Sequence, residues 1–181
     1  MHLLNHRSSK CLRTLAQTVI VEKKLFSDPC GAIWMSNESA PWALTIPSEP
    51  RLLPLTRAFI EAVCHLTGMD DTATHHVVLA VDEATSNIIR HAHQGASHHP
   101  IEIRCYVKEE GLQILLYDRG EPFDLEAIPI LNPAELRPGG RGVFLMRQLM
   151  DDIRVVPRPG GGNILALLKK KSSPVSPSCQ N

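Results

Sequence analysis

The residues best suited to chemistry begin with a polar pair in the segment VVLAVDEATSNIIRHAH, residues 77–93. Glu83 and Asn87 are four residues apart there, and on a helix that spacing stacks two side chains on one face. Arg90 and His91 extend this polar face by another turn. An Asn oxygen suits Mg²⁺ beside a triphosphate, because Mg²⁺ takes few protein oxygens and completes its shell with waters and phosphate oxygens. A neighbouring Glu could act as general base toward an incoming hydroxyl. By itself, the segment also fits an ordinary amphipathic helix with a solvated polar face.

The second stretch is YDRGEPF, residues 117–123, where Asp118 follows an apolar run and precedes Gly120. A carboxylate at the end of a strand only accepts hydrogen bonds, so it could take one from the exocyclic amine of adenine. Gly120 would let the ring approach the backbone closely. Taken alone, Asp-x-Gly is also a common turn sequence.

The third stretch is RPGGRGVFL, residues 137–145, in which glycines open a predicted helix. Unpaired N–H groups at a helix N-terminus, together with the helix dipole, suit a phosphate. Arg141 adds positive charge to that end. A glycine-rich linker before an amphipathic helix is the alternative interpretation. The stretch matches neither the GxxxxGK[ST] loop nor a dinucleotide fingerprint, so the usual phosphate-loop folds do not fit.

Helices and strands must bring these three stretches together. Apolar periodicity and turn residues predict strands at 42–48, 101–107, 112–117, 153–156 and 164–169, helices at 52–66, about 72–93 and 143–150, and a long loop at 120–140. The helices and strands segregate along the chain instead of alternating. That order predicts a mixed sheet covered by helices.

The two long helices each show a predicted buried stripe and predicted caps. Ser48 and Pro50 are placed to start the first helix, and Asp71 or Thr72 to cap the second. The first stripe consists of Leu52, Leu55, Phe59, Ala62, Val63 and Leu66. The second stripe consists of Val77, Val78, Val81, Ala84, Thr85, Ile88 and Ile89.

Composition limits the classes of protein that fit. The 181 residues suffice for one domain, and Lys+Arg and Asp+Glu balance at 19 each, which argues against bulk nucleic-acid binding. No apolar run reaches about 18 residues, the length a membrane span needs. We expect a flexible N-terminal extension at 1–43, a folded domain at 44–171 and a disordered tail at 172–181.

Neither the cysteines nor the histidines follow a spacing typical of a metal site or a redox motif. The five cysteines include no CxxC pair and are read as thiols in a reducing cytoplasm. Histidines are dense between His91 and His99, but without regular ligand spacing. A solvated helix end, where a cationic imidazole suits the dipole, is the favoured interpretation.

In order, the three stretches resemble the N box and the two glycine boxes of the GHKL superfamily, which includes histidine-kinase ATP domains, gyrase B and MutL. Within it, the chain resembles anti-sigma factors of the RsbW and SpoIIAB type. The phrases EATSNIIRHAH, YDRGEPFD, GGRGVFLMRQLMDDI and GGNILALLKK carry the resemblance, which runs from about residue 44 to 170. It implies an α+β two-layer sandwich, with a mixed, mostly antiparallel sheet covered by helices on one face.

The resemblance also implies a role for individual residues in binding ATP and Mg²⁺. Asn87 would ligate Mg²⁺, Glu83 would be the catalytic base and Asp118 would bind the adenine amine. The further nucleotide contacts it implies are Arg90, Gly120 under the base, Gly140, Arg141, Gly142 and Val143 around the phosphates, Asn163 near the adenine, and an ATP lid at about 125–139. The chain departs from the pattern at Pro122, where many members have a second glycine, and at Asn163, where relatives often carry Thr.

The function implied is that of a cytoplasmic regulatory serine/threonine kinase. It would phosphorylate a STAS-type anti-anti-sigma antagonist and sequester a sigma factor or a similar partner, with a homodimer as one oligomeric option. Direct nucleic-acid or membrane binding is not implied. Two alternatives stay open: a non-catalytic ATP-binding partner-switching module, and a detached histidine-kinase-like ATPase domain. A full sensor histidine kinase is not expected, since the sequence has no phosphoacceptor helix or transmembrane sensor.

Overall fold

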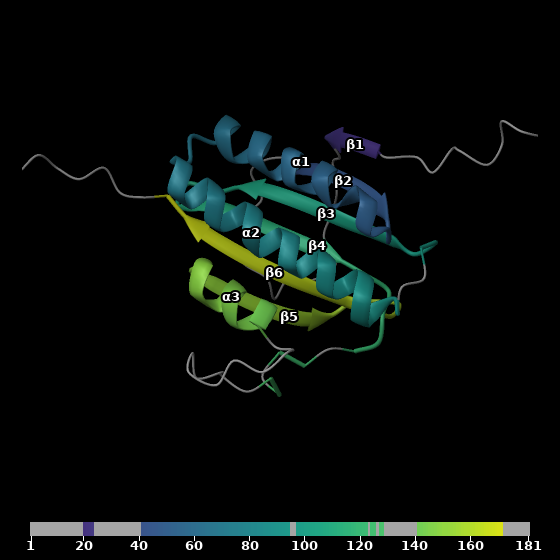
Figure 1. Cartoon of the computed structure of the whole chain (residues 1–181). Helices are drawn as coiled ribbons and strands as arrows, with labels where there is room; N and C mark the ends of the chain where they lie inside the picture. Colours follow the sequence, from purple (N-terminus) through teal and green to yellow (C-terminus); the bar gives the residue numbers. More distant parts are fainter. Residues whose placement is uncertain are drawn as a thin grey trace, which may run out of the picture.

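The computed structural model describes residues 20–23, 41–94, 97–122, 124–125, 127–128 and 141–171. In this part of the chain, six antiparallel strands form one sheet in the order β1-β2-β3-β4-β6-β5. The strands are β1 (Ile20–Lys23), β2 (Trp42–Pro47), β3 (Pro100–Val107), β4 (Gly111–Tyr117), β5 (Asp152–Pro157) and β6 (Asn163–Lys170) (Figure 1).

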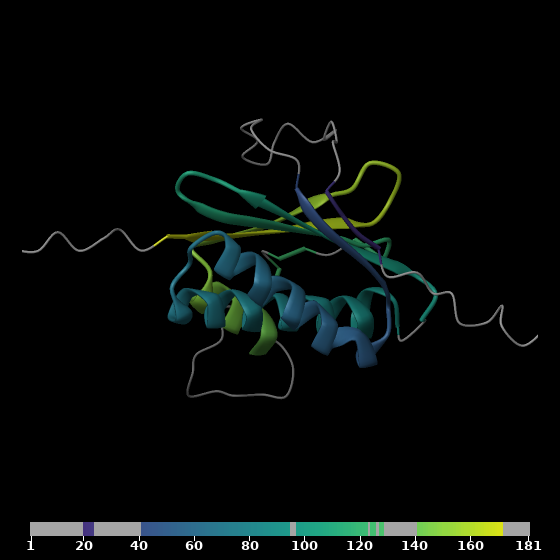
Figure 2. The same ribbon diagram turned by 90° about the horizontal axis from the view of Figure 1, so that it is seen from above.

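The helices all lie on one face of this sheet (Figure 2). They are α1 (Leu53–Leu66), α2 (Asp71–Asn87) and α3 (Arg141–Leu149), with a 3-10 turn η1 (Pro50–Leu52) before α1 and a π-helical turn η2 (Ile88–Ala92) after α2. The predicted α+β arrangement with helices on one face of the sheet is confirmed. The sheet was expected to be mixed, but all of its described strand pairs are antiparallel.

Short hairpins connect the strands that carry the site. Lys108 and Gly111 exchange backbone hydrogen bonds of 2.8 and 3.3 Å around Glu109 and Glu110, which closes β3 and β4 into the predicted hairpin. Strand β6 then lies between β4 and β5. As a result, the end of β4, at Tyr117, faces the start of β6, at Ile164.

The start of α2 differs from the prediction by one residue. Asp70, not Asp71 or Thr72, caps the helix, because its Oδ1 accepts a 2.8 Å hydrogen bond from the Ala73 N–H. Ser48 does not cap the first helix: its hydroxyl lies 2.8 Å from Nδ1 of His93 instead.

The core lies between the helices and the sheet. The stripe predicted on α2 is buried apart from Val78, which is half-buried, and Leu44, Ile103, Ile114 and Leu167 meet it from the strands. The stripe predicted on α1 is partly wrong. Leu55 is 38% and Leu66 70% exposed, and Ala62 is exposed too.

The buried face of α1 instead carries Thr56, Ile60, Val63 and Cys64. This helix lies at the edge of the helix layer, where α2 and β2 cover only one side of it (Figure 1). Apolar residues occur on two faces of this helix, and its packing against α2 and β2 decides which face is buried.

One further feature lies outside what the sequence predicted. Within the predicted extension at 1–43, Ile20–Lys23 form a strand that pairs antiparallel with β2, and β2 itself begins at Trp42. The predicted tail, 172–181, lies outside the described residues, so its disorder stays a prediction.

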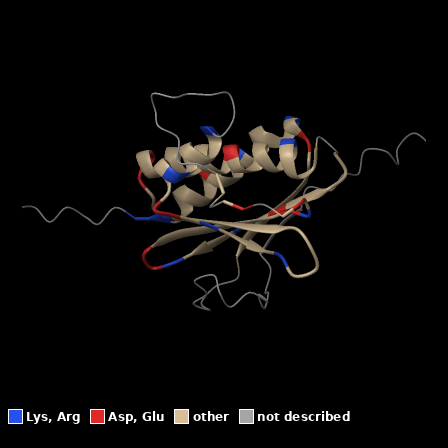
Figure 3. Ribbon diagram, turned by 90° about the horizontal axis from the view of Figure 1, so that it is seen from below, with Lys and Arg blue, Asp and Glu red and all other residues tan. Residues whose placement is uncertain are grey.

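Over the described elements, basic and acidic residues are interspersed (Figure 3). None of the helices described is long and apolar enough to cross a membrane.

Candidate nucleotide-binding site

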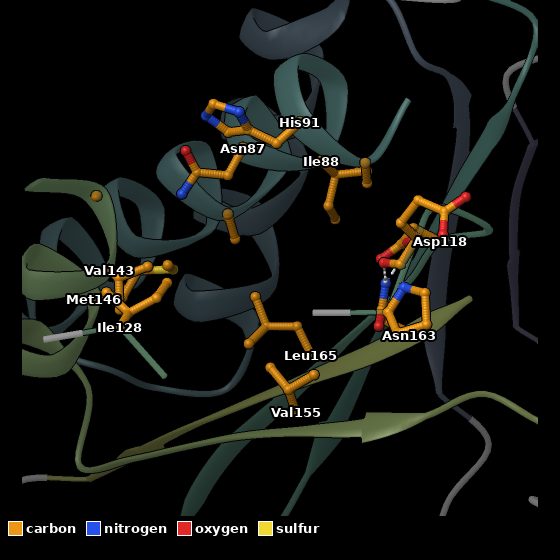
Figure 4. Close-up of a pocket in the computed structure, with 15 residues that line it drawn as sticks. Asn87, Ile88, His91, Asp118, Ile128, Val143, Met146, Val155, Asn163 and Leu165 are labelled. Atoms are coloured by element: carbon orange, nitrogen blue, oxygen red, sulfur yellow. Dashed lines mark hydrogen bonds between the residues drawn. The ribbon is translucent and has the colours of Figure 1, made fainter. Parts of the chain in front are cut away.

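A cavity of about 340 Å³ opens between α2, α3 and the sheet. Its walls are mostly apolar, with polar groups at two ends (Figure 4). The lining residues are Ala84, Asn87, Ile88, His91, Ala92, Asp118, Glu121, Pro122, Ile128, Gly142, Val143, Met146, Val155, Asn163 and Leu165. A volume of this size is in the range of sites for small molecules.

One polar end is formed where the start of α3 meets the polar face of α2. A Cβ added to Gly142 would lie 2.8 Å from Oε2 of Glu83 and 2.9 Å from Nδ2 of Asn87. The missing side chain therefore allows the first turn of α3 to approach both groups. The N–H groups of that turn have no partner within the helix, and the helix dipole makes this end positive. The arrangement can bind an anion beside a carboxylate and an amide.

The other polar end is formed by Asp118, directly after β4. Asp118 is 3% exposed, and its Oδ1 accepts hydrogen bonds from Gly120 N (2.7 Å) and Asn163 Nδ2 (3.2 Å). No hydrogen bond from the described residues ends on Oδ2. That oxygen is left to accept a donor from a ligand in the cavity.

Gly120 has a role that the sequence did not predict. A Cβ at this position would lie 2.3 Å from Cβ of Ala92 and 2.7 Å from its carbonyl oxygen. The glycine therefore lets the loop after β4 pack directly against η2. A π-helical turn of this kind is often found at functional sites.

The remaining predicted site residues differ in whether they line the cavity. Val143 lines the cavity. Arg141 is the exposed first residue of α3. Arg90 is exposed, hydrogen-bonds Ser86 through Nε at 3.1 Å, and is not part of the lining. Gly140 and most of the predicted lid at 125–139 lie outside the described residues.

The sequence placed His91 on the polar face of Glu83 and Asn87 without assigning it to the site, and it did not predict most of the apolar lining. Ala84, Ile88 and His91 follow the helical spacing of the Glu83–Asn87 face, so a helical projection could have found them. Val155 and Leu165 come from β5 and β6, and nothing in their local sequence indicates that they face α2.

The histidines do not form one solvated helix end, as the sequence interpretation had it. His93 is only 4% exposed, its ring lies 4.8 Å from that of His99, and its Nε2 has no hydrogen-bond partner among the described residues. Burial lowers the pKa of His93, and the charge of Asp118 opposes that shift. No group of three or more His, Cys, Asp or Glu side chains in the described part of the chain is arranged to hold a metal ion.

Comparison with known proteins shows the family to which this chain belongs. The family of the histidine kinase-like ATPase domain matches residues 46–169. The serine-protein kinase RsbW of Oceanobacillus iheyensis is 31% identical over 120 residues, which cover 62% of this chain and 76% of the relative. RsbW of Bacillus subtilis is 27% identical, with 67% and 81% covered.

Among solved structures, the RsbU and RsbW domains of a Mycobacterium tuberculosis protein share the fold, with a TM-score of 0.55 and 17% identity. That match covers 74% of this chain and 33% of the other. The chain belongs to the histidine kinase-like ATPase domain family and, within it, to the family of the RsbW serine-protein kinases.

Proposed function

We propose that this chain is an ATP-dependent serine/threonine protein kinase of a partner-switching system. It phosphorylates an anti-anti-sigma antagonist of the STAS type and sequesters a sigma factor or a similar regulatory protein. The relatives named serine-protein kinase RsbW support the reaction class. The observation that carries the proposal is the meeting of Glu83 with Gly142 and Asn87, which line one end of a cavity that has Asp118 at its other end.

The adenine of ATP binds at the Asp118 end. The carboxylate accepts a hydrogen bond from the exocyclic amine, and only an amine, not a carbonyl, can donate to it. Ile88, Met146 and Leu165 supply apolar surface for the faces of the ring. Burial of a flat heterocycle between such side chains provides affinity, while the single buried carboxylate provides orientation.

The triphosphate extends toward the start of α3. Backbone N–H groups of this turn and the charge of Arg141 bind phosphate oxygens. The amide oxygen of Asn87 is suited to hold Mg²⁺, which takes oxygen ligands and keeps several waters. When bound, Mg²⁺ neutralises charge on the phosphate oxygens.

Glu83 is the group that moves a proton. Its carboxylate takes the proton of the incoming serine hydroxyl while the serine oxygen bonds to the γ-phosphorus and the bond to the ADP oxygen breaks. ADP leaves with that electron pair, and the phosphoserine is the product. Asn87 and the turn around Gly142 keep the reacting groups beside Glu83.

Calorimetric titration with Mg²⁺ and ATP tests the binding step, and transfer of ³²P from ATP to a purified STAS-type antagonist tests the kinase step. In Asp118→Asn, the amide oxygen can still accept from the two donors that Oδ1 serves, which puts the amide nitrogen in the place of Oδ2, opposite the adenine amine. ATP binding should therefore weaken at least tenfold. Glu83→Ala should bind ATP like the wild type and abolish transfer, whereas Asn87→Ala should weaken Mg²⁺-dependent binding itself. Equal transfer by the wild type and Glu83→Ala would overturn the general-base assignment. Binding without any transfer by the wild type would favour the non-catalytic partner-switching module.

A further inference from the structure

Asn163 joins two hydrogen-bond acceptors at the Asp118 end of the cavity. Its Nδ2 lies 3.2 Å from Oδ1 of Asp118 and 2.8 Å from the main-chain oxygen of Glu121 (Figure 4). Both partners can only accept, so the amide nitrogen, and not the amide oxygen, must face them. Asn163 is 5% exposed, and water has little access to these bonds.

The turn between β5 and β6 holds the same loop at further points. The Asp118 N–H donates to the Asn163 carbonyl at 3.1 Å, and Nη1 of Arg158 lies 3.4 Å from the Asp118 carbonyl. A Cβ at Gly162, whose φ is +96°, would lie 2.1 Å from that carbonyl oxygen. The backbone of the turn therefore packs directly against Asp118, and the carboxylate is oriented before any ligand binds.

We propose that Asn163 is a positioning residue, which sets the Asp118 carboxylate for recognition of the base by holding Oδ1 and the Glu121 carbonyl with one amide. This inference rests on the proposed nucleotide binding. Because Oδ1 already accepts two hydrogen bonds from the protein, the carboxylate cannot rotate freely and presents Oδ2 to the ligand in a fixed orientation. A hydroxyl at position 163 has a single hydrogen to donate and could not hold both acceptors at once. Such preorganisation raises affinity by reducing the ordering that binding requires.

The substitution Asn163→Asp provides a direct test, since it puts a second carboxylate in the place of the amide. Two carboxylates in contact cannot both ionise easily, so the pair should retain a proton and one of its pKa values should rise. Without nucleotide, the Tm difference between Asn163→Asp and the wild type should therefore grow by several degrees from pH 5 to pH 8. The variant's Kd for Mg²⁺ and ATP, relative to the wild type at each pH, should be about tenfold to a hundredfold higher at pH 8 and recover toward pH 5.5.

The reciprocal double variant Asp118→Asn/Asn163→Asp is the matched control. It places a carboxylate and an amide opposite each other again, with their positions exchanged. Its Tm difference from the wild type should be independent of pH between 5 and 8. If the pH dependence persists in the double variant, burial of a carboxylate at position 163 causes it, and the proposed contact with Asp118 is wrong.

Two further outcomes separate this inference from the proposed function. A Kd ratio for Asn163→Asp that stays constant with pH, in a wild type that binds ATP, would overturn the positioning role alone. A folded wild type that binds no ATP would overturn the proposed function and base recognition together, while the Tm series still reports on the contact. Should Asn163→Asp not fold, Asn163→Thr should raise the Kd several-fold with a Tm within a few degrees of the wild type. An unchanged Kd in that variant would refute the positioning role.

Discussion

The substitution Gly142→Ala separates the fold from the chemistry of the site. The added methyl group would lie 2.8 Å from Oε2 of Glu83 and 2.9 Å from Nδ2 of Asn87. Both contacts are too short by at least about 0.6 Å, since ordinary van der Waals separation is about 3.5 Å or more. The atoms that must move are the ends of two flexible side chains, so the backbone can stay in place.

The expected magnitudes follow from these contacts. Displacing a catalytic group by a fraction of an ångström removes it from the productive geometry, which must hold within about 0.5 Å. We therefore expect the rate of phosphoryl transfer to fall roughly tenfold or more. Alanine is a better helix former than glycine, and this gain of up to about 1 kcal/mol offsets the crowding. The free energy of unfolding should change by less than about 1 kcal/mol.

Single-turnover transfer from ATP to the antagonist, together with urea unfolding, measures both quantities on one preparation. Gln148→Ala, at an exposed position on the same helix, is the control and should change neither. A Gly142→Ala protein that keeps its stability and transfers phosphate within twofold of the wild-type rate would refute the reasoning. In that case, Glu83 and Asn87 would not act in the positions that the start of α3 gives them.

Two other predictions concern stability. Gly120→Ala should lower the free energy of unfolding, measured by urea titration, by about 1–3 kcal/mol. The added Cβ would lie 2.7 Å from the backbone of Ala92, which cannot move aside as a side chain can. Unchanged stability would mean that the loop after β4 does not pack on η2. His93 should make the protein less stable in mild acid. Burial lowers the pKa of His93 in the folded state, so the unfolded chain binds the proton more readily. Stability is therefore unaffected above the ordinary His pKa of about 6.5 and decreases as the pH falls from there toward the folded-state pKa. Unfolding measured from pH 5 to pH 7.5 should show a smaller loss of stability with acid for His93→Gln, and equal losses would contradict the assignment to His93.

Features that depend on spacing within one element could be predicted from the sequence. Glu83 and Asn87 share a face because any helix puts residues four apart together, and Asp118 stands at a strand end because the apolar run before it stops there. The hairpin between β3 and β4 followed from its polar, glycine-ended turn. The order of these stretches along the chain was enough to indicate the family that the comparisons then showed.

Contacts between distant residues were decided by tertiary packing alone. Asn163 and Asp118 are 45 residues apart, and only the pairing of β6 with β4 puts an amide against the carboxylate. The sequence of α1 offers two apolar arcs, so the choice that leaves Leu55 and Leu66 exposed comes from its place at the edge of the helix layer. Gly142 owes its contact with Glu83 to the packing of α3 on α2. Local sequence sets which side chains an element presents to each side, and the energy of packing whole elements together sets what each side chain meets.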